Sequence, residues 1–175
     1  MRVIAGQFRS RRLKSIPGLT TRPTPDRLRE SLFSILSPRI EDSVFLDAYA
    51  GTGAVGIEAL SRGSRHAYFL ERNRGAIEVI RENLGSLGLQ ARATIVTGPV
   101  LLTLARYPAD IVFLDPPYEQ QREYRSALDI LAENPPPLTV VQHSVHFGLE
   151  DSYGGLERTR RVRHGDNVLS FFVKS

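Results

Sequence analysis

The sequence of 175 residues contains no cysteine, which excludes disulfide bonds, thiolate metal sites and a cysteine nucleophile. No uninterrupted apolar run approaches the roughly 18 residues of a membrane-spanning helix. The first residues lack the charged region and long apolar core of a signal peptide. Hydrophobic residues make up 41% of the chain and charged residues 24%, which is typical of globular rather than disordered or fibrous proteins. We therefore expect one soluble, cytoplasmic domain that makes no membrane contact.

Lysine is scarce, since 21 of the 23 basic residues are arginine. A GC-rich genome would produce this excess, and so would selection for phosphate contacts, which suit the planar guanidinium. The charge is unevenly distributed, with a net charge of +7 over residues 1–40 and −5 over residues 41–150. A basic terminal segment on a mildly acidic body predicts a nucleic-acid partner. The expected RNA-contacting residues are Arg2, Arg9, Arg11, Arg12, Lys14, Arg22 and Arg27.

The basic segment divides into an arm and a helix. Residues 2–16 predict two short strands in a basic hairpin whose apolar residues are too sparse to join the core. A helix is expected to follow, with Thr24 as its N-cap, Pro25 at its first position and Pro38 at its end. We expect residues 1–40 to be an extension of the domain formed by residues 41–175.

From residue 43 onward, apolar strands alternate with amphipathic helices. The expected strands are 43–48, 66–71, 93–97, 110–115 and 138–142, and the expected helices are 53–62, 74–87, 100–106 and 124–133. This alternation predicts an α/β fold with a mostly parallel, doubly wound sheet. A hairpin of residues 156–163 and 168–174 is expected to add antiparallel strands at one edge.

A glycine-rich turn follows the first strand of the predicted sheet. Gly51, Gly53 and Gly56 form a G-x-G-x-x-G pattern between a strand and a helix, and Glu71 ends the next strand, where a carboxylate suits ribose hydroxyls. The glycine pattern alone is a weak signal, because many sharp turns need glycine. Strand, glycines, helix and acid together predict a nucleoside-containing cofactor.

Asp47 favours one class of cofactor over another. Dehydrogenases and methyltransferases share the arrangement just described, but a carboxylate beside the turn would repel the pyrophosphate of a dinucleotide. It would attract the ammonium group of S-adenosyl-L-methionine, which carries no phosphate. The alternative is that Asp47 caps the first turn of the following helix.

The strand 110–115 ends in Asp115-Pro116-Pro117-Tyr118. Ligands in open α/β sheets bind at the carboxyl ends of strands, so this loop is expected beside the glycine turn. The two prolines remove N–H donors and fix the backbone. The rigid carbonyls that remain, with the Asp115 carboxylate, are acceptors that suit an exocyclic amino group. Tyr118 offers a face on which a base can stack. We therefore predict that these four residues are catalytic. The alternative is a proline-rich turn with a packing tyrosine.

The Asp-Pro-Pro-Tyr sequence resembles the signature of methyltransferases that act on N6 of adenine, N4 of cytosine or N2 of guanine. Segments 2–13, 22–33, 46–60 and 113–118 together resemble the RsmD family, bacterial 16S rRNA guanine-N2 methyltransferases, over essentially the whole chain. This resemblance implies a Rossmann-like class I fold and a monomer that methylates 16S rRNA, alone or in an assembling 30S particle. It also implies that Asp115, Pro116 and Tyr118 hold the guanine. The cofactor residues expected from the turn and the resemblance are Asp47, Tyr49, Gly51, Gly53, Glu71, Arg72, Gly98 and Val100.

Pro99 occupies the place where the family usually has an acidic or amide residue, so adenine recognition is expected to fall to backbone groups near Gly98 and Val100. The four histidines show no metal-binding spacing with carboxylates, and no metal is expected. Two other functions remain open. One is an adenine-N6 methyltransferase of DNA or RNA, and the other is a catalytically silent RNA-binding factor of ribosome assembly.

Overall fold

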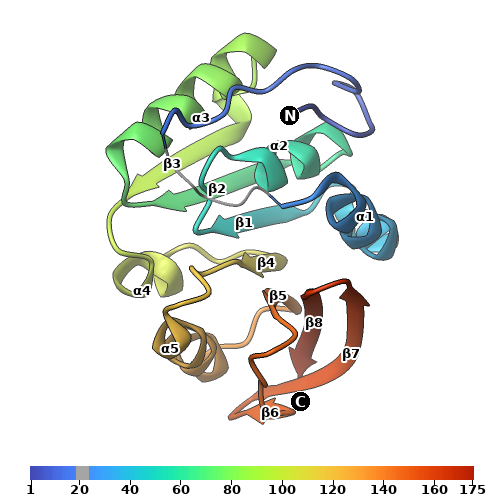
Figure 1. The fold of residues 1–175 in the computed structure, drawn as a ribbon, viewed down its shortest axis with the longest axis vertical. Coiled ribbons are helices and arrows are strands. Elements are labelled where there is room, and N and C mark those ends of the chain that lie inside the picture. Colours follow the sequence, from blue (N-terminus) through green and yellow to red (C-terminus); the bar gives the residue numbers. More distant parts are fainter. Residues whose placement is uncertain (19–23) are drawn as a thin grey trace.

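The computed structural model describes residues 1–18 and 24–175, and its centre is an eight-stranded sheet (Figure 1). In spatial order the strands are β3 (Ala93–Thr97), β2 (His66–Glu71), β1 (Val44–Ala48), β4 (Ile111–Leu114), β5 (Leu138–Ser144), β8 (Asn167–Lys174), β7 (Leu156–His164) and β6 (Ser152–Tyr153). The first five strands pair in parallel and the last three are antiparallel. The predicted sheet is confirmed, and only the short β6 was not expected.

Helices cover both faces of the parallel strands. They are α1 (Asp26–Ile40), α2 (Ala54–Ser61), α3 (Arg74–Leu87), α4 (Val100–Thr103) and α5 (Gln121–Glu133), with 3₁₀ turns at Gln90–Arg92 and Leu104–Arg106. Neighbouring residues of one strand, such as Phe45 and Leu46, belong to different apolar clusters on the two faces. This double burial explains the continuous apolar runs of the strands. None of the helices in the described ranges is long and apolar enough to cross a membrane.

Three expectations about α1 were wrong: Thr24 is not its N-cap, Pro25 is not its first residue and Pro38 does not end it. The helix starts at Asp26 behind an extended Pro25, and the hydroxyl of Thr24 lies 3.3 Å from the side-chain oxygen of Gln142 instead of capping the helix. Pro38 lies inside the helix, which continues to Ile40. Ile40 is buried in the core, and this packing holds the last turn despite the hydrogen bond that proline cannot donate.

The N-terminal arm, residues 1–18, is not the predicted two-stranded hairpin. It has a single antiparallel bridge, between Arg2 and Arg12, and otherwise consists of turns and irregular backbone. The expectation that it stays off the core was also wrong, because Val3 and Leu13 are buried there, with 1% and 5% of their surface exposed. The bridge places these two residues together, so that a sparse pattern still yields an apolar anchor.

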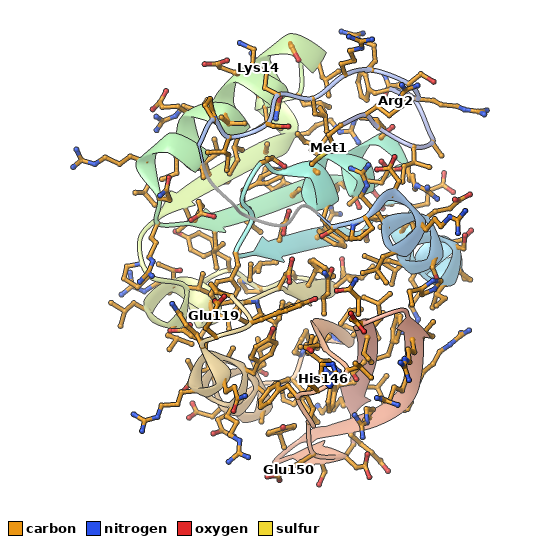
Figure 2. All side chains as sticks on the ribbon, in the orientation of Figure 1. Met1, Arg2, Lys14, Glu119, His146 and Glu150 are labelled. Carbon is orange, nitrogen blue, oxygen red and sulfur yellow. The ribbon has the colours of Figure 1, made fainter. Side chains whose placement is uncertain are left out.

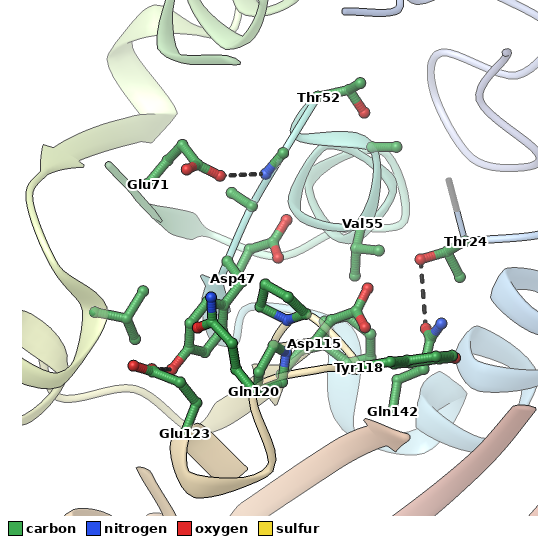
Figure 3. Close-up of a pocket in the computed structure, with 18 of the residues that line it drawn as sticks. Thr24, Asp47, Thr52, Val55, Glu71, Asp115, Tyr118, Gln120, Glu123 and Gln142 are labelled. Carbon is green, nitrogen blue, oxygen red and sulfur yellow. Dashed lines mark hydrogen bonds between the residues drawn. The ribbon is translucent and has the colours of Figure 1, made fainter. Parts of the chain in front are cut away.

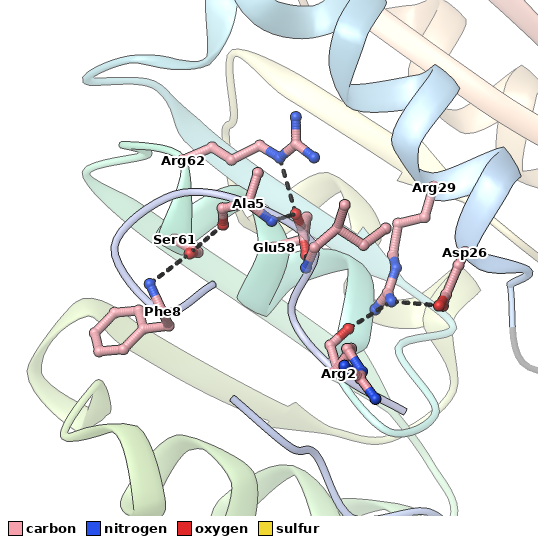
Figure 4. Close-up of polar contacts among 9 residues, drawn as sticks. Arg2, Ala5, Phe8, Asp26, Arg29, Glu58, Ser61 and Arg62 are labelled. Atoms are coloured by element: carbon pink, nitrogen blue, oxygen red, sulfur yellow. Dashed lines mark hydrogen bonds and ion pairs between the residues drawn. The ribbon is translucent and has the colours of Figure 1, made fainter. Parts of the chain in front are cut away.

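Buried polar groups fasten the N-terminal arm to the rest of the protein (Figure 4). The carboxylate of Glu58, fully buried on α2, accepts hydrogen bonds from the backbone N–H groups of Ile4 at 2.9 Å and Ala5 at 3.0 Å. Arg29 of α1 is also fully buried, and its guanidinium donates to the carbonyl of Arg2 at 2.7 Å. These contacts fix the path of the arm over helices α1 and α2.

Candidate active site

A cleft of about 840 Å³ opens at the carboxyl ends of the parallel strands (Figure 3). Its volume lies within the usual range of ligand pockets. The cleft brings together most of the residues predicted from the sequence, namely Asp47, Tyr49, Gly51, Glu71, Arg72, Val100, Asp115, Pro116, Pro117 and Tyr118. Gly53 and Gly98 lie outside the cleft wall. The two predicted halves of the site therefore face one space.

The glycines of the turn have distinct roles. Gly51 has a φ of +58°, and a Cβ there would meet nothing within 4 Å, so its backbone is open to the cleft. At Gly56 a Cβ would lie 2.4 Å from the ring of Phe69, so glycine is needed where α2 packs closely on β2. One glycine thus leaves its backbone open to the cleft, and the other allows close packing of helix on strand.

Glu71 joins the end of β2 to the glycine turn. One carboxylate oxygen accepts a hydrogen bond from the N–H of Gly51 at 2.8 Å, and the other accepts from the N–H groups of Arg72 and Asn73 at 2.9 Å. An ionised carboxylate has about four acceptor positions, so Glu71 can still accept a hydroxyl group of a ligand. The carbonyl of Glu71 in turn accepts from the N–H of Gly98 at 3.1 Å, which places Gly98 in support of the cleft.

Asp47 makes the helix-capping contact that the sequence left open as an alternative, and it also faces the cleft. One of its oxygens accepts a hydrogen bond from the N–H of Gly56 at 2.9 Å in the first turn of α2. Burial raises the pKa of Asp47 well above its usual range; the Gly56 bond opposes the rise, and the charges of Asp115 and Glu71 add to it. Three carboxylates around one cleft favour a cationic ligand.

Asp115 lacks the support that the other two carboxylates have. No group in the described ranges donates a hydrogen bond to it, and burial raises its pKa to about 7. Its neighbours are held firmly, because the carbonyl of Pro116 accepts from the hydroxyl of the buried Tyr124 at 3.0 Å. The hydroxyl of Tyr118 donates to the side chain of Asn167. A polar carboxylate without a donor therefore stands in a rigid loop.

Several residues of the cleft wall were missed in the sequence. Gln142 follows the rule that identified Asp115, since it also lies near the carboxyl end of a buried strand. Glu123 accepts a hydrogen bond from the hydroxyl of Tyr49, whose φ of 63° is unusual for a non-glycine residue. Asn167 approaches from the β7–β8 turn, and no local sequence signal marks it.

The predicted RNA-contacting side chains lie on the surface, and Arg2 and Lys14 are marked in Figure 2. Arg9 and Arg12 are exposed, whereas the exposed side chains of Arg11 and Lys14 reach α3, where Lys14 pairs with Glu82. Met1, Ser15 and Ile16 of the same N-terminal arm line the cleft. The arm therefore carries exposed basic groups up to the cleft rim. Arg27 is exposed at the start of α1, and Arg22 lies outside the described residues.

The histidines show no sign of a metal site. No group of three or more metal-ligating side chains occurs within residues 1–18 and 24–175. His143 is buried on β5, where its Nε2 lies 2.8 Å from the hydroxyl of Ser170. Burial lowers the pKa of His143, because the charged imidazolium is disfavoured away from water.

Residues 1–173 match the model of the family described as Conserved hypothetical protein 95. The chain belongs to this family. It is 42% identical to Ribosomal RNA small subunit methyltransferase D of Escherichia coli over 69% of this chain and 61% of that protein. It is 33% identical to YlbH of Bacillus subtilis over 99% of both chains. These similarities confirm the predicted resemblance to the RsmD family.

The fold is also that of a solved relative. The structure of yhhF from Escherichia coli superimposes with a TM-score of 0.87 at 32% identity, covering 100% of this chain and 98% of that chain. The predicted Rossmann-like fold of the class I methyltransferases is thereby confirmed.

Proposed function

We propose that the protein transfers a methyl group from S-adenosylmethionine to the exocyclic N2 amino group of a guanine in 16S ribosomal RNA. The observation that carries the proposal is Asp115, a carboxylate without a donor among the described residues, in the same cleft as the glycine turn. Relatives in Escherichia coli and Haemophilus influenzae are named Ribosomal RNA small subunit methyltransferase D. Their names support ribosomal RNA as the substrate.

The residues of the glycine-turn end fit the cofactor. The open backbone at Gly51 allows close approach, Glu71 retains about one acceptor position for a ribose hydroxyl, and Asp47 supplies a carboxylate for an ammonium group. Tyr49, Arg72 and Val100 would complete its walls. When bound, the cofactor supplies an electrophilic methyl carbon. A cation at this place would also relieve the mutual repulsion of the buried carboxylates.

The Asp-Pro-Pro-Tyr end would hold and orient the amino group. The carboxylate of Asp115 and the carbonyl of Pro116 are acceptors that bind the two N–H bonds, so that the nitrogen lone pair turns out of conjugation with the ring. The amino nitrogen must lose one proton. With a pKa of about 7, Asp115 is suited to take it at neutral pH.

The target base also needs a surface and a grip on its strand. The hydroxyl of Tyr118 is anchored on Asn167, which fixes a ring on which a flipped or unpaired guanine can stack. The exposed basic residues of the N-terminal arm would hold phosphates near the cleft rim.

Tritium transfer tests this function. The protein is incubated with tritiated S-adenosylmethionine and with naked 16S rRNA, 30S particles or DNA, and the labelled nucleosides are separated. We expect label in N2-methylguanosine from an RNA substrate. Label in N6-methyladenosine, or no transfer to any of these substrates, would refute the proposal. The Asp115→Asn variant controls for contaminating methyltransferases, because it leaves the shape of the site intact.

A further inference from the structure

A second, smaller pocket of about 240 Å³ lies between the start of α1 and the tip of the β7–β8 hairpin. Its walls are Pro25, Arg27, Leu28, His164, Gly165 and Asn167. We call it the side pocket. Pro25 and Asn167 also line the large cleft, so these two residues form a partition between the hollows. The side pocket is therefore the immediate neighbour of the place proposed for the target base.

The side pocket is built from side chains that are already held. The Nε2 atom of His164 lies 3.0 Å from the hydroxyl of Ser31 on α1, which fixes the imidazole ring. Asn167 is buried, and its side chain accepts the hydroxyl of Tyr118 from the cleft side. Arg163 donates to the carbonyl of Gly165 at 2.8 Å and steadies the hairpin tip. Such preorganised walls reduce the ordering cost of binding.

The lining combines a flat ring, apolar surface and a cation. Pro25 and Leu28 are apolar, and His164 presents an aromatic ring. Arg27 is exposed, and its guanidinium makes no hydrogen bond or ion pair with any residue of the described ranges. The tip carries one acidic residue, Asp166, and the basic Arg163 lies in the same hairpin. A nucleotide matches this combination, since its base stacks on flat surfaces and its phosphate pairs with arginine.

We propose that the side pocket holds the RNA nucleotide adjacent to the target guanine, with its base against His164 and its phosphate at Arg27. The inference rests on the proposed function and adds a determinant of sequence context to it. Successive nucleotides of an unstacked strand occupy neighbouring sites, and here the partition of Pro25 and Asn167 separates one base from the next. Because Asn167 also holds Tyr118, a base in the side pocket buttresses the stacking surface for its neighbour.

The test uses a short synthetic RNA centred on the methylated nucleotide, which is first mapped on 16S rRNA with the wild-type protein. Two further RNAs lack the base on one side or the other of the target. Tritium transfer gives kcat/KM for the three RNAs with wild type, His164→Ala and His164→Phe. His146→Ala is the matched control, because His146 is exposed and lines neither hollow.

In wild type, removing the base that occupies the side pocket lowers kcat/KM about tenfold, the size of one lost stacking contact. His164→Ala lowers kcat/KM for the intact RNA by a similar factor, and removing that base then has no further effect, because the two changes delete one interaction. His164→Phe restores most of the loss, since it keeps a flat ring. His146→Ala behaves as wild type.

Arg27 gives an independent measurement on the same pocket. Arg27→Ala should flatten the dependence of log K on log salt for RNA binding by about one phosphate contact. Arg39→Ala removes the same charge from the other end of α1, about 18 Å away along the helix, and should leave the slope unchanged.

The outcomes separate this inference from the proposed function. If wild type methylates the RNA but tolerates removal of either neighbouring base, the side pocket does not bind a nucleotide. Additive effects of His164→Ala and base removal would overturn the inference equally. Failure of the wild-type protein to methylate any RNA would refute the proposed function, and the inference with it.

Discussion

At the glycine-turn end of the cleft, the carboxylates of Asp47 and Glu71 accept hydrogen bonds from backbone N–H groups. At the other end, Asp115 accepts none from the described residues, although its neighbours Pro116 and Tyr118 are held by hydrogen bonds. At the first end, both carboxylates already have hydrogen-bond donors within the protein. At the second end, Asp115 has none among the described residues, so its oxygens remain available as acceptors for a ligand. Asp115 is half-buried and faces the cleft, so a ligand in the cleft can donate to it.

This difference assigns the two ends different tasks. Under the proposed function, the carboxylates of Asp47 and Glu71, which already hold backbone N–H groups, would form a rigid frame for the cofactor. The substrate amino group would donate to Asp115, whose pKa burial raises to about 7. The account therefore predicts large catalytic effects at Asp115 and binding effects at the glycine-turn end.

The largest effect is expected for Asp115→Asn, which should lower the single-turnover rate of methyl transfer by about 10³-fold. The substitution removes the charge and the acceptor strength that hold the amino group. Affinity for S-adenosylmethionine, measured by calorimetry, should change little. A variant that retains near wild-type turnover would remove Asp115 from the mechanism.

The next effect concerns the N-terminal arm. Replacing Arg9, Arg11, Arg12 and Lys14 by alanine should weaken RNA binding and flatten its salt dependence by roughly 0.7–0.9 log unit for each lost phosphate contact. Thermal stability should change little, because exposed ion pairs contribute little to folding.

A double variant, Arg39→Ala with Arg65→Ala, is the control for the arm. Both residues are exposed. Arg65 lies just before β2, at the amino ends of the parallel strands, whereas the cleft is at their carboxyl ends. Parallel salt lines for the quadruple variant and wild type would show that the arm does not contact RNA.

A smaller effect is expected at the glycine-turn end. Glu71→Ala should weaken the binding free energy of S-adenosylmethionine by about 1–3 kcal/mol, which is the range for lost hydrogen bonds to a charged group. Glu78→Ala is the matched control, since Glu78 is exposed on α3 and pairs only at the surface with Arg81. Unchanged affinity in a folded Glu71→Ala variant would place the ribose elsewhere.

The parts of the fold with local signals could be predicted from the sequence. The bounds of α3 were predicted correctly because its signals are local: the side chain of Asn73 caps its first turn, and Gly88 adopts the left-handed conformation after its last. The path of the N-terminal arm could not be predicted, since Glu58 holds N–H groups more than 50 residues away in sequence. The pairing of Tyr118 with Asn167 is similarly remote.

In the site, too, features with local sequence signals could be predicted, and contacts between distant residues could not. Asp47, Glu71 and Asp115 stand at strand ends, where the topology of a parallel sheet gathers side chains, so sequence reasoning could find them. The hydrogen bonds of these three carboxylates could not be predicted from the sequence. Nothing in the sequence distinguishes Glu71, which holds three backbone N–H groups, from Asp115, which none of the described residues supports.

The most direct test of this contrast is the free energy of unfolding of wild type and Asp115→Asn, measured by urea denaturation at pH 5 and pH 8. The raised pKa of Asp115 means that the folded protein binds a proton that the unfolded chain has released, so the contribution of Asp115 to stability falls as pH rises from about 4 to 7. Asparagine does not titrate. The free energy of unfolding of Asp115→Asn minus that of wild type should therefore increase by roughly 2 kcal/mol from pH 5 to pH 8. A difference that stays constant, or that favours wild type more at pH 8, would contradict the account.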